Sequence, residues 1–150
     1  MILPICPPDL SSRPFHLTVD RVMIASPEVL YRALTTEFDR WFALPGSLLM
    51  KPEVNGVFFF ESEFEGKRHP HYGRFLRLQS NHLIEFTWIT GPDGTRGTET
   101  VVTIELIPRE VGTRLKLTHV GFPDEESKNK LSHSWPILLE QLDQKLATSS

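Results

Sequence analysis

Three segments in the second half of the sequence alternate apolar and polar residues, and this alternation leaves few possible folds. The segments are 84–88, 102–106 and 114–119. In each one the apolar residues share one parity and the polar residues the other, which predicts a half-buried strand. Strands of this kind are typical of an antiparallel sheet that is covered on one face only. Another part of the chain must therefore cover that face.

The covering element is predicted at the C-terminal end, over about 127–147. Apolar residues recur there at helical spacing: Leu131, Trp135, Leu138, Leu139, Leu142 and Leu146. Such a stripe indicates an amphipathic helix that packs on one side. Pro136 lies inside the stripe, so we expect a kink or a helix that restarts there.

The first half of the sequence predicts one strand and two short helices. The strand covers 15–24, and Ser26-Pro27 supplies the N-cap and first position of a helix. A second helical piece carries Phe38, Trp41 and Phe42 on one side. Turn signals then separate six more strands, near 47–53, 56–65, 71–79, 82–90, 98–108 and 112–120. The order predicts an α+β fold, a curved antiparallel sheet wrapped around the C-terminal helix.

Composition limits the domain organisation and the partners. The 150 residues fit one domain, which we place at 15–150, and residues 1–14, with four prolines, indicate a flexible N-terminal arm. Cys6 is the only cysteine, so an intramolecular disulfide and a multi-cysteine metal site are excluded. The net charge of −3 argues against nucleic-acid binding. We recognise neither a signal peptide nor a transmembrane span, and expect a cytoplasmic protein.

Several segments resemble a known family. They are 83–88 (LIEFTW), 112–119 (GTRLKLTH), Gly121-Phe122-Pro123 and the pair His133 and Trp135. In this order they are similar to the helix-grip fold of the SRPBCC superfamily, which includes the birch-pollen-allergen and START lipid-transfer proteins. More narrowly, they resemble the family named after the activator of heat-shock protein 90 ATPase.

The resemblance covers nearly the whole chain from Phe15 to Leu146, with two departures. The family often has a double glycine where this chain has Asn55-Gly56. The eukaryotic co-chaperone carries an additional N-terminal domain, for which we find no room here. The fold is therefore carried over without the co-chaperone activity.

The resemblance implies a cavity between the sheet and the long helix. Strand parity and the helical stripe select the residues expected to line it: Trp41, Phe58, Phe60, Trp88, Thr100, Val102, His119, Trp135, Leu138 and Leu139. Trp41, from the short helices, is the candidate lid. The alternative is that the same aromatic residues fill a solid core.

Within this set, His119 is the main candidate for a polar contact with a ligand. Burial of its imidazole should lower its pKa and keep the ring neutral. The ring would then orient a ligand carbonyl or hydroxyl. Alternatively, it bonds to a backbone carbonyl or to a hydroxyl inside the core, and Thr100 has the matching parity.

Other polar residues give weaker signals. His69 and His71 have a spacing that can bind a metal, but we expect solvated loop histidines and no metal. Three glutamates alternate on one strand face and three arginines follow them: Glu61, Glu63, Glu65, Arg68, Arg74 and Arg77. An acid pair for catalysis is one interpretation. A solvated outer face neutralised across strands is the preferred one. Cys6 lies in the proline-rich arm without a structured base.

These observations leave three function hypotheses. The first is a binding protein whose hydrophobic cavity takes an apolar, aromatic or lipid-like small molecule. The second is an enzyme of the polyketide cyclase or aromatase kind, with His119 as acid or base. The third is a chaperone-associated interaction module, suggested only by the family name. We prefer the first because no paired catalytic constellation is present, and we assign no catalytic residue, metal or cofactor. A monomer and a homodimer both remain open.

Overall fold

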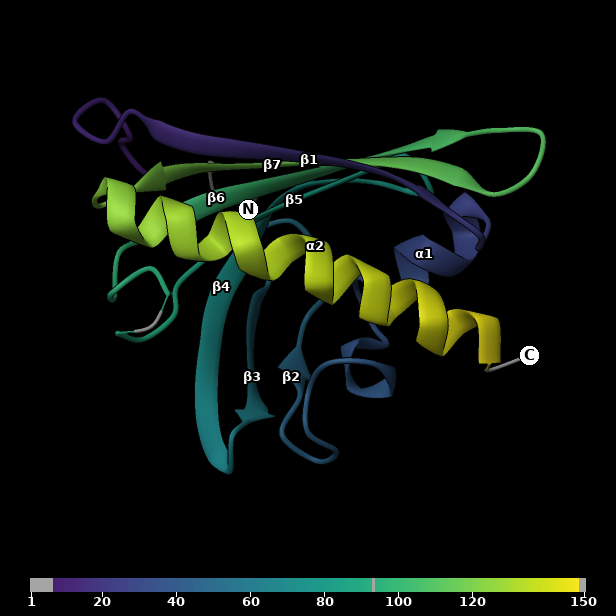
Figure 1. The fold of residues 1–150 in the computed structure, drawn as a ribbon, viewed down its shortest axis with the longest axis horizontal. Coiled ribbons are helices and arrows are strands. Elements are labelled where there is room, and N and C mark those ends of the chain that lie inside the picture. The colour runs from purple at the N-terminus through teal and green to yellow at the C-terminus, as the bar shows by residue number, and fades with distance from the viewer. Residues whose placement is uncertain (1–6, 93, 149–150) are drawn as a thin grey trace, which may run out of the picture.

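A computed structural model of the chain describes residues 7–92 and 94–148. The elements are β1 (Phe15–Met23), α1 (Pro27–Ala33), the 3-10 helix η1 (Phe38–Arg40), β2 (Leu49–Met50), β3 (Val57–Phe64), β4 (Lys67–Gln79), β5 (Leu83–Trp88), β6 (Thr100–Pro108), β7 (Thr113–Phe122) and α2 (Glu125–Thr148). The strands form one antiparallel sheet in the order β1-β7-β6-β5-β4-β3-β2. Helix α2 runs across the sheet, and β2, β3 and the lower half of β4 bend away from the other strands (Figure 1). The predicted α+β helix-grip fold is confirmed.

The long helix is anchored to the first strand of the sheet by a buried carboxylate. Asp143 of α2 accepts a hydrogen bond from the Ile24 backbone N–H at 3.0 Å and one from the Arg21 guanidinium at 3.2 Å. Two donors satisfy the charge that burial would otherwise penalise. Leu139 and Leu142 on the same helix are fully buried. The apolar stripe of α2 therefore faces the sheet as its spacing predicted.

A β-bulge explains why the sequence pattern of β4 is apolar on both faces. Phe75 pairs with Phe86 and Arg77 pairs with Glu85, so Leu76 is the additional residue between them. A bulge shifts the alternation by one residue. Phe75 and Leu76 are consequently both buried, at 0% and 3% exposure, while Arg77 turns outward to Glu85.

Several predicted elements differ in extent from the observed ones. The strand predicted over 47–53 contains only Leu49–Met50, since its neighbour β3 offers pairing there to these two residues. Strand β4 begins at Lys67, four residues earlier than predicted. Pro70 is tolerated in it because pairing on the β5 side begins only at Tyr72, which bridges to Ile89 just after β5, so Pro70 has a neighbouring strand on one side alone.

The helical predictions also need correction. Helix α2 continues through Pro136 and does not restart there. The exposed proline lies on the solvent side of a helix whose other side is held by buried Leu131, Trp135 and Leu139. The second short helical piece is a single 3-10 turn that ends before Trp41. In the part of the chain that the structure describes, no helix is long and apolar enough to cross a membrane.

The described part of the N-terminal arm, residues 7–14, contacts the end of the sheet. The Arg13 guanidinium donates to the backbone carbonyls of Gly121 at 2.8 Å and Glu99 at 2.7 Å. Gly121 has a φ of +88°, and a Cβ added to it would meet the Leu10 side chain at 2.6 Å. Leu10 and Arg13 therefore tie this stretch to β7 and to the residue before β6. Cys6 lies outside the described residues.

Candidate functional site

The ten residues predicted to line a cavity come together in one core. Nine of them are buried, and Leu138 is partly buried against the same cluster. Aromatic rings connect much of the set, with ring centroids 6.2 Å apart for Phe58 and Phe60, 5.9 Å for Phe60 and Trp88, and 5.5 Å for Trp88 and Trp135. Sheet parity and helical stripe thus identified a true spatial cluster.

Within this core both nitrogens of His119 are hydrogen bonded. The Trp135 indole N–H of α2 donates to His119 Nδ1 at 2.9 Å. Because an indole nitrogen only donates, Nδ1 must accept, and the neutral ring carries its proton on Nε2. That proton points to the Thr100 hydroxyl, 2.7 Å away, which in turn donates to the Trp88 backbone carbonyl at 2.6 Å. The chain of donors and acceptors therefore runs in one direction, from helix to sheet.

This arrangement agrees with the alternative interpretation of His119, in which the ring bonds to a hydroxyl inside the core. His119 has no exposed surface, and burial lowers its pKa to about 3. A ligand that used either nitrogen would have to break a hydrogen bond between buried groups. The same holds for a proton transfer to or from the ring.

Trp41 is fixed at both its side chain and its backbone. Its indole N–H donates to the Ala33 carbonyl at 2.7 Å, and its own carbonyl accepts from the Gln141 side chain at 2.7 Å. The ring is buried and stacks on Phe38 and Phe42. These contacts link η1 to α1 and α2, so Trp41 holds the two short helical segments against the long helix.

A second buried histidine, His71 on β4, lies among aromatic rings. Its ring stacks on Phe60, with centroids 4.7 Å apart and an angle of 14° between the planes. Trp88 and Phe42 lie at centroid distances of 4.9 and 5.1 Å. His71 Nε2 is 2.9 Å from the buried Ser62 hydroxyl on β3. The expectation of a solvated loop histidine is therefore wrong for His71, because β4 extends further than predicted.

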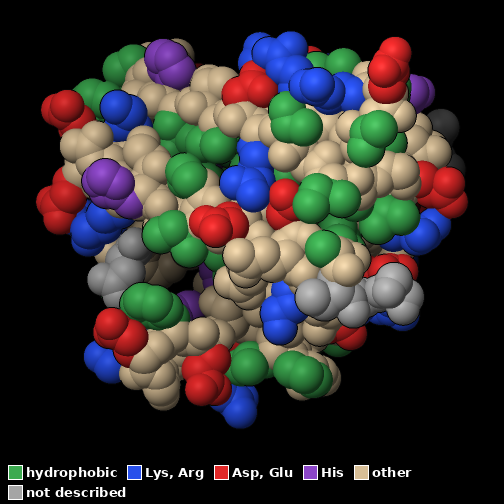
Figure 2. Space-filling view, turned by 45° about the vertical axis from the view of Figure 1, so that its right-hand side comes forward, with side chains coloured by type: hydrophobic (Ala, Val, Ile, Leu, Met, Phe, Trp, Pro, Cys, Tyr) green, Lys and Arg blue, Asp and Glu red, His purple; other side chains and the backbone are tan. Residues whose placement is uncertain are grey.

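The other nitrogen of His71 differs from those of His119. Nδ1 of His71 is buried and has no hydrogen-bond partner, and the same is true of Nε2 of His69, two residues earlier on β4. Burial lowers the pKa of His71 to about 3, and the neighbouring His69 adds to the effect. The space-filling view has a hollow in which histidine side chains are visible (Figure 2).

The parity of β4 carries a sequence signal for this site. His69 and His71 share parity with Gly73 and Phe75, which continue the inner face of β4. Gly73 lies under the ring of Phe58, and a Cβ there would be 2.4 Å from that ring. Extending the strand backward through Pro70 would have placed both imidazoles on the inner face.

The chemistry available to this cluster is limited. Ser62 and His71 form a hydroxyl–imidazole pair, but within the described residues no carboxylate bonds His71 Nδ1 as a triad would require. The described residues also contain no group of three side chains suited to a metal ion. The cross-strand neutralisation expected for the outer face is present, since Arg68 pairs with Glu61 at 3.4 Å.

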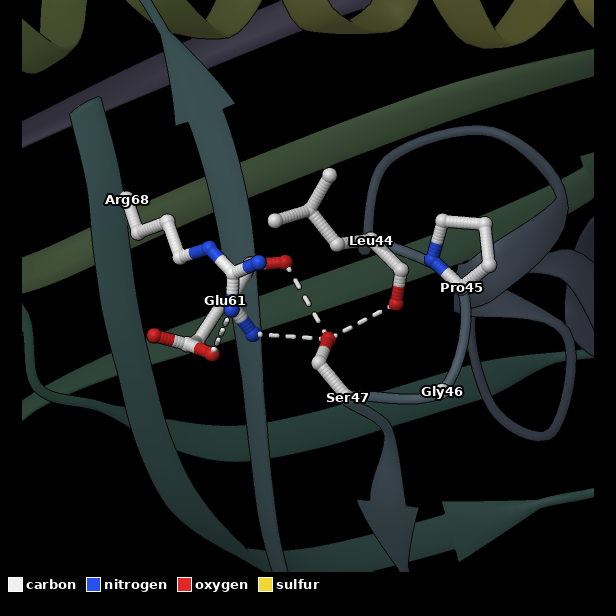
Figure 3. A pocket seen from close by; sticks show the side chains of 6 residues that line it. All are labelled: Leu44, Pro45, Gly46, Ser47, Glu61 and Arg68. Atoms are coloured by element: carbon white, nitrogen blue, oxygen red, sulfur yellow. Dashed lines mark hydrogen bonds and ion pairs between the residues drawn. The ribbon is translucent and has the colours of Figure 1, made fainter. Parts of the chain in front are cut away.

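Two pockets open elsewhere on the surface. One, of about 260 Å³, lies between β3, β4 and the segment 44–47 (Figure 3). Ser47 Oγ donates there to the Leu44 carbonyl at 2.8 Å and accepts from the Glu61 backbone N–H at 3.1 Å. The other, of about 520 Å³, lies on the outer side of β4 beside Tyr72 and Ile89. Neither is lined by a residue of the predicted set.

Comparison with known proteins shows what the chain resembles. Residues 24–147 match the model of the family described as Activator of Hsp90 ATPase homolog 1-like protein. A solved structure from Mesorhizobium loti is 26% identical, with a TM-score of 0.74, covering 91% of this chain and 99% of that one. One from Chromobacterium violaceum is also 26% identical, with a TM-score of 0.69 and coverage of 87% and 96%.

More distant structures share the fold alone. The Aha1 dimer from Colwellia psychrerythraea is 20% identical, with a TM-score of 0.68, and the match covers 91% of this chain and 98% of that one. No curated protein matches the chain in sequence. The family match spans most of the chain, from the end of β1 to the last turn of α2. On this evidence, the chain belongs to the Activator of Hsp90 ATPase homolog 1-like protein family.

Proposed function

We propose that the protein binds an apolar small molecule on the inner face of the β3–β4 hairpin, beside His71. The observation that carries the proposal is the unpartnered, buried Nδ1 of His71 in a wall of aromatic rings. A small-molecule site typically combines an apolar lining with a few polar groups that orient the ligand. This end of the core has both.

The same reasoning moves the polar anchor away from His119. Its two nitrogens are hydrogen bonded to Trp135 and Thr100, and Thr100 donates in turn to the Trp88 carbonyl. We call this series of hydrogen bonds the relay. Leaving a buried polar group unpaired costs about 1–3 kcal/mol. A ligand therefore gains more by pairing with His71, which has no such bond at Nδ1, than by displacing a partner of His119. The acid–base enzyme hypothesis relied on His119 and loses its support with it.

Binding can be tested with N-phenyl-1-naphthylamine, a neutral apolar fluorophore. We expect one saturable site per chain and quenching of tryptophan emission, because Trp88 lies 4.9 Å from the His71 ring. Phe42→Ala removes a half-buried ring that touches His71, and should weaken binding at least fivefold, the factor expected from the loss of about 1 kcal/mol of apolar contact.

The matched control is Tyr72→Ala, an aromatic truncation next to His71 in sequence but on the opposite face of β4. It should leave binding unchanged. If no saturable binding is seen, the proposal is wrong. If Tyr72→Ala abolishes binding while Phe42→Ala does not, the ligand occupies the outer pocket instead. The chaperone interaction suggested by the family name and the cytoplasmic location stay predictions.

A further inference from the structure

The two histidines of β4 say more about the ligand than that it is apolar. His69 and His71 lie on the same face of the strand, opposite Ser62 and Phe60 of β3. Each has one buried nitrogen without a hydrogen-bond partner. A purely apolar ligand leaves these buried nitrogens unpaired, which is the costly arrangement for a buried polar group. A ligand with a hydrogen-bonding group of its own avoids that cost.

The donor and acceptor roles of the His71 nitrogens limit which polar group the ligand can carry. A neutral imidazole has one N–H donor and one acceptor nitrogen. The Ser62 hydroxyl can either donate to His71 Nε2 or accept from it, so Nδ1 is a donor in one tautomer and an acceptor in the other. A hydroxyl group both donates and accepts, and it therefore fits either tautomer without rearranging the pair. An amine with a free N–H fits the tautomer in which Nδ1 accepts.

The charges around the site argue against anionic ligands such as carboxylates. The only buried ionisable side chains among the described residues are His71, His119 and Asp143. His71 and His119 are neutral at physiological pH, because burial lowers the pKa of each to about 3. Asp143 is already bonded to Ile24 and Arg21.

Neither cation at this end of the hairpin is buried. Arg68 lies on the other face, is exposed and pairs with Glu61, and Lys67, which has the parity of His69 on β4, is exposed as well. A carboxylate drawn into the site would lose its hydration and find no buried lysine or arginine in the described chain to replace it.

From this geometry we infer that the site takes an uncharged ligand with a hydroxyl or amine group on a flat apolar body, and rejects carboxylates such as fatty acids. The inference rests on the proposed function and specifies the ligand of that same site. A flat body suits this wall of aromatic rings, because the ring centroids of Phe60 and Trp88 lie 4.7 and 4.9 Å from that of His71 and 5.9 Å from each other. The hydroxyl or amine would bond to Nδ1 of His71.

Three ligands of one shape test it: 2-naphthol, 2-methylnaphthalene and 2-naphthoate, titrated at pH 7.5 with tryptophan fluorescence as the readout. We expect 2-naphthol to bind about fivefold to tenfold more tightly than 2-methylnaphthalene, the factor that one hydrogen bond supplies. The 2-naphthoate anion should bind more weakly than either.

The variant His71→Phe keeps an aromatic ring and removes the nitrogens. In it the preference for 2-naphthol should disappear, while 2-methylnaphthalene binds as well as before. His69→Phe, at a half-buried position, is the second variant and keeps the test valid if His71→Phe fails to fold. It should reduce the preference in part. His133→Phe, on an exposed histidine of α2, should leave the preference unchanged.

Two results would contradict the inference in distinguishable ways. Equal binding of the three ligands, or tightest binding of 2-naphthoate, overturns the ligand class and leaves the proposed binding site in place. Absence of saturable binding for all three, together with N-phenyl-1-naphthylamine, removes the proposed function and the inference with it. A preference for 2-naphthol that survives in both histidine variants would also overturn the role of these two residues.

Discussion

Replacing Thr100 with valine tests the hydrogen-bond relay that occupies His119. The substitution keeps the branched shape of the side chain and removes only the hydroxyl. In the folded protein this hydroxyl accepts from His119 Nε2 at 2.7 Å and donates to the Trp88 carbonyl at 2.6 Å. Thr100 and His119 have no exposed surface, so water cannot take over either bond. Thr100→Val therefore leaves the imidazole N–H buried without a partner.

The expected loss of unfolding free energy follows from that unsatisfied group. An unpaired buried donor costs about 1–3 kcal/mol. For a chain of this size each kcal/mol lowers the Tm by about 2–4 °C. The cost should shrink in a His119→Leu background, because the donor that Thr100 serves is then gone. The Trp135 indole N–H loses its acceptor in both members of that comparison, so its contribution cancels.

Urea unfolding of the four proteins of this cycle gives the coupling energy between Thr100 and His119. Thr118→Val is the matched control, since Thr118 is next to His119 but half-buried on the opposite parity of β7. Its effect should stay within about 0.5 kcal/mol. The relay is refuted if Thr100→Val costs no more than Thr118→Val, or if the cost is the same with and without His119.

Two further predictions concern pH and the long helix. The pKa values of His71 and His119 lie near 3 in the folded chain, below the ordinary value of 6.5, so the unfolded chain binds more protons in between. Stability should thus be full above pH 6.5 and fall as the pH drops toward 3, by about 1.4 kcal/mol per pH unit for each histidine. Urea unfolding between pH 6.5 and 5.0 measures this dependence. His71→Phe should reduce the slope of unfolding free energy against pH by the contribution of one histidine, about 1.4 kcal/mol per pH unit. A stability that does not change with pH would contradict both pKa shifts. Pro136→Ala should raise the unfolding free energy by about 1–3 kcal/mol, since proline disfavours a helix interior and Pro136 is exposed. Ile137→Ala, at an exposed neighbour, should change it little in the same assay, and an unchanged or lower stability of Pro136→Ala would mean that the proline serves the packing of α2.

Much of the fold was predictable because its signals are local. Alternation in β5, β6 and β7 and the stripe in α2 each require only the order of neighbouring residues, and the observed elements agree with them. The predictions for β4 failed at two positions where a single residue interrupts the regular pattern. The bulge at Leu76 breaks the alternation within one strand, and Pro70 resembles a turn residue until its missing strand neighbour is known. Neither feature leaves a periodic signal.

In the candidate site, too, burial was predictable from the sequence and the hydrogen-bond partners were not. Local periodicity is enough to predict which side chains face the inside, and Phe58, Phe60, Trp88, His119 and Trp135 are all buried together. Which histidine has hydrogen-bond partners at both ring nitrogens depends on the packing of distant elements. His119 is bonded to residues 16 and 19 positions away on other elements, whereas His71 keeps a nitrogen unpaired. The physical reason is that burial follows from local periodicity, while a hydrogen-bond partner depends on which distant groups the fold brings within about 3 Å.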